Sequence, residues 1–124
     1  MIAADTCSLS AYFKGEQGRD VDAIAMAFAA TTICIPPVVL TEMLSDPASQ
    51  VAMLETVADF AVLEVLDGYW HRAGENRRLL KAKGLRCKIA DSLVAQSCID
   101  HNVALITRDE DFRHFAAHCG LKLA

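Results

Sequence analysis

The sequence lacks any long apolar run, although 53% of its 124 residues are hydrophobic. A helix needs roughly 18 or more consecutive apolar residues to span a bilayer, so no membrane-spanning segment and no membrane partner are expected. The amino terminus also lacks the basic stretch that opens a secretory signal peptide, and Asp5 interrupts its apolar residues early. We therefore expect a cytoplasmic protein.

The sequence also lacks the cysteine pairs and cysteine–histidine clusters of structural zinc sites. Its five cysteines are an odd number, none has Cys-x-x-Cys spacing, and most have apolar neighbours. We interpret them as reduced, buried, small hydrophobic side chains. This use of cysteine agrees with a reducing compartment.

An excess of positive charge is absent too, because the formal net charge is −4. This balance does not favour a nucleic-acid binder that relies on bulk positive charge. If the substrate is a polyanion, bound cations must neutralise part of this acidity.

No internal repeat, low-complexity segment or linker divides the chain, so residues 1–124 are expected to form a single domain. Apolar or β-branched runs predict strands over residues 1–4, 31–35, 61–66 and 103–107, with LKL near the end as a candidate last strand. Helical patterns are found between them, over residues 8–14, 20–30, 37–46, 48–59, 67–83, 89–101 and 109–118. This alternation predicts an α/β fold, a three-layer α/β/α sandwich around a mainly parallel sheet.

Four carboxylates fall near the carboxyl ends of predicted strands, where ligands bind in sheets of this kind. Asp5 follows the first strand, and Asp109 follows the last clear one. Glu42 lies in the helix after the second strand, on a face with apolar residues. Asp91 occupies the first turn of the helix over 89–101, which is otherwise apolar or small on the same face. We expect these four acids to meet at one end of the sheet.

Each acid also has a purely structural interpretation. Asp91 would interact favourably with the helix dipole, and Asp109 would cap the last helix. Asp5 would be a turn residue, and Glu42 would face solvent. Spacing alone leaves both interpretations open, but the coincidence of four acids at equivalent positions favours a shared site.

Crowded carboxylates repel one another, and burial costs each of them free energy unless a partner compensates. Mg²⁺ and Mn²⁺ prefer oxygen ligands and provide that compensation. One or two such ions can hold a phosphodiester, activate a water and stabilise the leaving oxygen. The acids therefore predict Mg²⁺ or Mn²⁺ as a cofactor.

The stretches that carry these acids are DTCSL, LTEML, IADSLVAQ and LITRDEDF. Their order and spacing resemble the motifs of PIN-domain nucleases, most closely the VapC-type toxins of bacterial toxin–antitoxin pairs, over essentially the whole chain. The resemblance implies an endoribonuclease that uses metal ions to hydrolyse RNA phosphodiester bonds. It also implies a homodimer and a cognate antitoxin of a type II toxin–antitoxin system that blocks the site.

The resemblance assigns site residues position by position. It makes the catalytic acids Asp5, Glu42, Asp91 and Asp109. It makes Asp5, Asp91 and Asp109 the metal ligands. Small hydroxyls that support the acids are implied at Thr6, Ser8 and Thr107. Asp111 is expected to support the site or to cap a helix, although the DED run leaves open which of its two aspartates is the fourth acid.

Six of the twelve basic residues lie between positions 77 and 88, directly before the Asp91 helix. They are Arg77, Arg78, Lys81, Lys83, Arg86 and Lys88. They would hold RNA phosphates beside the metal, or else form a solvated helix face whose late cations favour the helix dipole. Arg108, next to Asp109, is a second phosphate candidate.

Two other functions stay open. The chain would be a PIN-like nuclease for RNA processing outside a toxin–antitoxin pair, or a non-catalytic PIN-like binding module in which the acids are structural. The complete set of four acids argues against the second.

Overall fold

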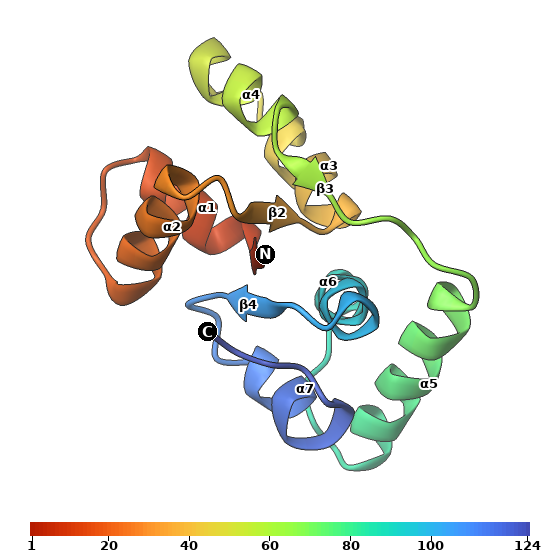
Figure 1. The fold of residues 1–124 in the computed structure, drawn as a ribbon. Helices are drawn as coiled ribbons and strands as arrows, with labels where there is room; N and C mark the ends of the chain where they lie inside the picture. Colours follow the sequence, from red (N-terminus) through yellow and green to blue (C-terminus); the bar gives the residue numbers. More distant parts are fainter.

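Four short parallel strands form the centre of the structure, a computed structural model that describes residues 1–124 (Figure 1). The strands are β1 (Ile2–Ala4), β2 (Ile33–Ile35), β3 (Ala61–Val62) and β4 (Ala104–Ile106). They lie in the order β3-β2-β1-β4, and every pairing is parallel. The predicted parallel sheet is therefore confirmed.

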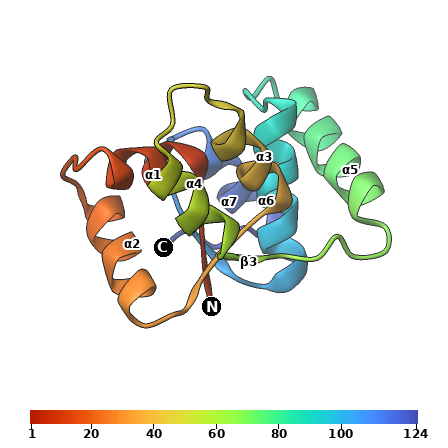
Figure 2. The same ribbon diagram turned by 90° about the horizontal axis from the view of Figure 1, so that it is seen from above.

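Seven helices connect and cover the strands. They are α1 (Thr6–Phe13), α2 (Arg19–Ala29), α3 (Pro37–Ser45), α4 (Val51–Ala58), α5 (Tyr69–Ala82), α6 (Ile89–His101) and α7 (Phe112–Cys119). Figures 1 and 2 show α1 and α2 on one side of the sheet and α5 and α6 on the other, so the predicted layers are confirmed. None of the helices combines the length and apolar character needed to cross a lipid bilayer.

Several predicted boundaries are wrong. The strand over 31–35 begins at Ile33 and the helix over 48–59 begins at Val51, and three further differences have a structural reason. The strand over 61–66 ends at Val62, because β3 lies at the sheet edge and its chain leaves β2 after the Leu63 amide donates to the Ile35 carbonyl. LKL forms only an isolated bridge to β4 through Leu123. The last helix begins at Phe112 instead of residue 109, because the preceding residues form a loop held by side-chain contacts.

The helix α6 is the most buried helix of the fold, since it lies between the sheet and α5. The predicted apolar stripe of Val94, Ala95 and Cys98 is almost completely buried. Gln96 and Ser97 are buried as well, although both are polar. Burial on most of its surface explains why α6 combines apolar with small residues and shows little amphipathic pattern.

A polar seam joins α5 to α6. Arg72 donates from Nε and Nη2 to the two carboxylate oxygens of Asp100, at 3.0 and 2.7 Å. Gln96 donates to Asp100 at 2.8 Å and accepts from Asn76 at 2.8 Å. The hydrogen bonds from Arg72 hold the pKa of Asp100 below its ordinary value. This seam satisfies the buried side-chain amide of Gln96 and the carboxylate of Asp100 in α6.

The seam makes a prediction about stability and pH. A carboxylate with a lowered pKa contributes stability above the pKa of the unfolded chain, and this contribution is lost as pH falls through the folded-state pKa. We expect Asp100→Asn to lower the Tm by roughly 3–6 °C at pH 7 and by clearly less at pH 3, measured by calorimetry. Glu55→Gln, an exposed change in α4, is the control. An equal loss of Tm at both pH values would contradict the assignment.

Candidate metal centre

The register of β1 and β4 brings two segments of the site together. Ala4 pairs with Ile106 in the parallel ladder, so the next residues, Asp5 and Thr107, leave the sheet side by side. Thr107 Oγ1 donates to Asp5 Oδ2 at 3.1 Å, and the Asp5 amide donates to the Ile106 carbonyl at 3.0 Å. The carboxyl edge of the sheet is therefore where the predicted acids begin to meet.

Asp5 is held in one orientation by hydrogen bonds. Its Oδ1 accepts from the Thr6 amide at 2.8 Å, which caps α1, and its Oδ2 accepts from Cys7 Sγ at 3.2 Å as well as from Thr107. Only 7% of the residue is exposed. Burial raises the pKa of Asp5, and these hydrogen bonds oppose the rise. Asp5, which is a predicted site residue, therefore also caps the amino terminus of α1.

Side-chain hydrogen bonds also shape the loop after β4. The Asp109 amide donates to Thr107 Oγ1 at 3.0 Å, and the Asp111 amide donates to Asp109 Oδ1 at 2.9 Å. Thr107 therefore hydrogen-bonds to the carboxylate of Asp5 and to the backbone amide of Asp109. The loop carries Asp109 and Asp111 toward the first turn of α6.

Three carboxylates converge there. Asp91, Asp109 and Asp111 each offer an oxygen, and these atoms lie within 4.8 Å of one another. Asp111, expected from the sequence to support the site or to cap a helix, thus lies in the same cluster as Asp109. Both members of the DED pair face Asp91.

Asp91 is in an unfavourable environment for a charged group. Its Oδ2 is buried and has no hydrogen-bond partner. Burial, followed by the negative charges of Asp109 and Asp5, raises its pKa to about 6. An unsatisfied oxygen among acids fits a hard divalent cation, which would supply both a partner and neutralising charge. The residues present therefore fit Mg²⁺ or Mn²⁺.

Glu42 lies apart from these three carboxylates. It is exposed on α3, and its Oε1 accepts from Thr6 Oγ1 at 2.9 Å, so Thr6 links it to α1 beside Asp5. Thr6 and Glu42 also line a groove of about 760 Å³ formed by residues of α1, α3 and α4, with Phe13 and Gln50 among the lining residues. Glu42 is thus joined to Asp5 through the neighbouring Thr6, and not by direct contact.

Ser8, the third predicted hydroxyl, makes no hydrogen bond to the predicted acids. Its side chain is completely buried, and its Oγ has no hydrogen-bond partner. Its supporting role stays a prediction.

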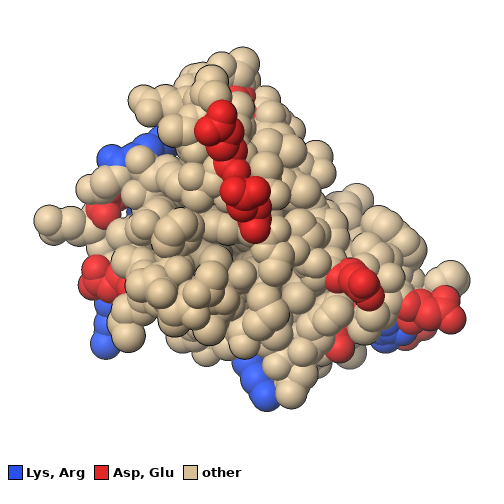
Figure 3. Space-filling view, turned by 45° about the horizontal axis from the view of Figure 1, so that its top comes forward, with Lys and Arg blue, Asp and Glu red and all other residues tan.

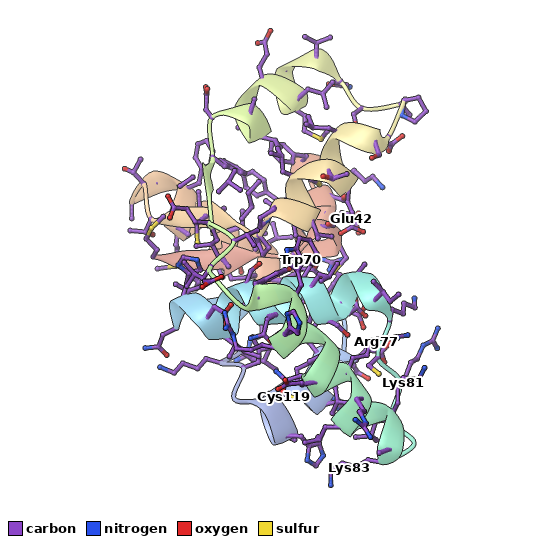
Figure 4. The ribbon with its side chains drawn as sticks, turned by 90° about the vertical axis from the view of Figure 1, so that its right-hand side faces the viewer. Glu42, Trp70, Arg77, Lys81, Lys83 and Cys119 are labelled. Carbon is purple, nitrogen blue, oxygen red and sulfur yellow. The ribbon has the colours of Figure 1, made fainter.

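The basic residues between positions 77 and 88 divide into two groups. Arg77 donates to the Cys87 carbonyl at 2.9 Å, and Arg86 pairs with Asp111 at 3.6 Å. The others are exposed, namely Arg78, Lys81, Lys83 and Lys88. Figure 4 shows Arg77, Lys81 and Lys83 on the part of α5 that leads toward α6. Figure 3 shows another face, where Lys and Arg are few and lie near the rim.

Arg108 is also engaged. Its guanidinium pairs with Asp20 of α2 and with Glu16 of the α1–α2 loop, so its charge is already compensated within the fold. Neither this contact nor the bond from Cys7 to Asp5 is foreseen from the sequence. The partners of Arg108 are 88 and 92 positions away in the chain, and no local pattern signals them.

Several solved structures resemble this fold. One is VapBC2 from Rickettsia felis bound to a DNA fragment from its promoter, with a TM-score of 0.74, 22% identity, and coverage of 100% of this chain and 98% of that one. FitAcB from Neisseria gonorrhoeae has a TM-score of 0.71, 15% identity, and coverage of 99% and 96%. VapBC-5 from Mycobacterium tuberculosis, a member of the VapBC family of toxin–antitoxin systems, has a TM-score of 0.71, 22% identity, and coverage of 98% and 95%. At these identities the likeness shows a shared fold.

Comparison of the sequence with curated proteins gave no match. The family model described as the PIN domain, in contrast, matches residues 2–118, which include β1 to β4 and all of the acids above. Nearly the whole chain is matched, and the fold agrees. This protein belongs to the PIN domain family.

Proposed function

We propose that this chain is a metal-dependent endoribonuclease and the toxin of a type II toxin–antitoxin pair. The observation that carries the proposal is the convergence of Asp91, Asp109 and Asp111, with an unsatisfied buried oxygen on Asp91. Membership of the PIN domain family and the similarity to structures of toxin–antitoxin complexes support it.

In this proposal Asp91, Asp109 and Asp111 hold one Mg²⁺ or Mn²⁺, and Asp5 contributes from its position beside them. A bound ion supplies positive charge for the phosphoryl oxygens and the leaving oxygen. The protein holds the carboxylate ligands in one orientation and keeps their side chains from rotating into others. Thr107 does this for Asp5 and for the backbone of Asp109.

Glu42 has a different role from the ligands. It is exposed, accepts a hydrogen bond from Thr6 and lines the groove beside α1. We assign it to orienting the attacking water or to helping hold a second ion. A carboxylate accepts a proton from such a water, which suits this position.

The exposed cations after α5 are assigned to the RNA backbone. Lys88 lies close enough to Asp91 for its charge to lower the pKa of that acid, which opposes the effect of the neighbouring carboxylates. Lys81, in the last turn of α5, and Lys83, directly after it, add two further exposed positive charges. Phosphate contacts of this kind position an RNA without reading its sequence.

The partners in this proposal are an RNA substrate, a cognate antitoxin that covers the acids, and a second copy of the chain in a homodimer. The solved complexes whose toxin-like chains share this fold support an antitoxin partner.

The first test concerns cleavage. We expect Asp91→Asn and Asp5→Asn each to reduce cleavage of total cellular RNA by about 100-fold or more, because each removes a carboxylate that would help hold the ion whose charge stabilises the developing oxyanion. Cleavage sites would be mapped by sequencing with Mg²⁺ or Mn²⁺, and a chelator should abolish them. Asp22→Asn, on the exposed start of α2, is the control. Full activity in both site variants would contradict the proposal.

A second test uses stability in the absence of metal. A carboxyl group whose pKa is raised on folding destabilises the folded state once it ionises, so the cost grows as pH rises through the interval between 3.8 and about 6. In excess chelator, Asp91→Asn should raise the Tm by roughly 2–5 °C at pH 7.5 and leave it unchanged at pH 4. A lower Tm at pH 7.5 would mean that the charged Asp91 is stabilising.

A third test concerns the basic stretch. Changing Lys81, Lys83 and Lys88 to glutamine should weaken RNA binding and reduce the slope of log affinity against log salt by about 0.7 for each phosphate that the protein no longer neutralises. Fluorescence anisotropy with the cleavage-deficient Asp91→Asn protein measures this slope. Lys122→Gln, an exposed lysine outside the stretch, is the control. An unchanged slope would favour a solvated helix face that does not bind RNA.

A further inference from the structure

The loop between Ile106 and Phe112 carries two of the three converging carboxylates but has no helix or strand of its own. Its shape therefore depends on side-chain anchors. One anchor is Thr107, which binds Asp5. A second is the next residue, Arg108, and a looser contact is the pair of the exposed Arg86 with Asp111, at 3.6 Å.

Arg108 connects this loop to α2, which lies on the side of the sheet opposite α6. Its Nε and Nη2 donate to the two carboxylate oxygens of Asp20 at 2.7 and 3.2 Å, and its Nη1 donates to Glu16 Oε1 at 3.3 Å. The Asp20 side chain is only 10% exposed. A bidentate arginine–carboxylate pair fixes orientation as well as distance, because both groups are planar. The hydrogen bonds from Arg108 also lower the pKa of Asp20 to about 2.

The ion pair of Arg108 and Asp20 packs against the backbone at Gly18, where there is no side chain. A Cβ at this position would lie 2.5 Å from Asp20 Oδ1 and 3.3 Å from Arg108 Nη2. Its φ of +156° also lies in a range that other residues rarely adopt. Glycine is thus required at this position. This steric argument for a close contact does not depend on the charges of Arg108 and Asp20.

We propose that Arg108 is a positioning residue for the metal ligands, acting through Asp20 and Glu16. By holding the loop against α2, it sets the separation of Asp109 and Asp111 from Asp91. Productive sites require ligands to be held within about 0.5 Å, and a loop without the Arg108 anchor would not meet this demand. The inference rests on the proposed metal site and gives Arg108 a role different from that of a phosphate ligand.

The experiment measures Mn²⁺ affinity directly, by electron paramagnetic resonance on the purified chain without RNA. We expect Arg108→Ala to weaken Mn²⁺ binding about 10-fold, as loss of a group behind metal ligands commonly does. Arg108→Lys keeps the charge but loses the bidentate geometry, and should fall between this variant and the wild type. Cleavage should recover largely at saturating Mn²⁺, because the ligands themselves remain.

Two further variants separate positioning from general stability. Gly18→Ala leaves every charge in place but displaces the Asp20 carboxylate, and it should also weaken Mn²⁺ binding. Arg72→Ala removes the other bidentate ion pair of the fold, between α5 and α6, at a position separate from the converging acids. It should lower the Tm while changing Mn²⁺ affinity by less than about twofold.

The outcomes distinguish this inference from the proposed function. If Asp91→Asn abolishes Mn²⁺ binding while Arg108→Ala and Gly18→Ala bind as tightly as the wild type, the positioning role is wrong and the metal site stands. If Asp91→Asn binds Mn²⁺ normally, the proposed function itself fails. If Arg108→Ala keeps its Mn²⁺ affinity but loses RNA affinity with a smaller salt slope, Arg108 is a phosphate ligand and the inference is overturned.

Discussion

The parallel register between β1 and β4 is the constraint on which the site depends. Because Ala4 pairs with Ile106, Asp5 and Thr107 leave the sheet together, and Thr107 can bind Asp5 and the backbone of Asp109 at once. A shift of one residue would turn these side chains to opposite faces of the sheet. Backbone hydrogen bonds between β1 and β4 thus bring together segments about a hundred positions apart, and this pairing does not require any contact between the acids.

Electrostatics explains why the acids need such firm support. Carboxylates repel one another, and burial raises the pKa of both Asp5 and Asp91. The fold opposes this in two ways: hydrogen bonds fix Asp5, and the positive charge of Lys88 acts on Asp91. The buried oxygen of Asp91 remains unsatisfied, and this residual cost is what a divalent cation would remove. Stability is thus given up at the position proposed for catalysis.

Much of the fold follows from local pattern. The alternation of strands and helices predicts the parallel sheet, and the bounds of α6 agree with those expected from its apolar stripe. Boundaries differ where distant residues decide them. The edge strand β3 is short because it has one neighbour, and α7 begins late because Thr107 and Asp109 bind the backbone of the loop before it.

The sequence by itself determined which acids are available and which end of the sheet they approach, because strand ends and helix starts are local properties. Only the tertiary structure decided that Asp111 lies beside Asp91 together with Asp109, that Ser8 is buried without a hydrogen-bond partner, and that Arg108 pairs with Asp20. These outcomes depend on helix rotation and on contacts across the whole fold. The partner of a side chain such as Arg108 lies far away in the sequence, so only the folded chain determines which partner it contacts.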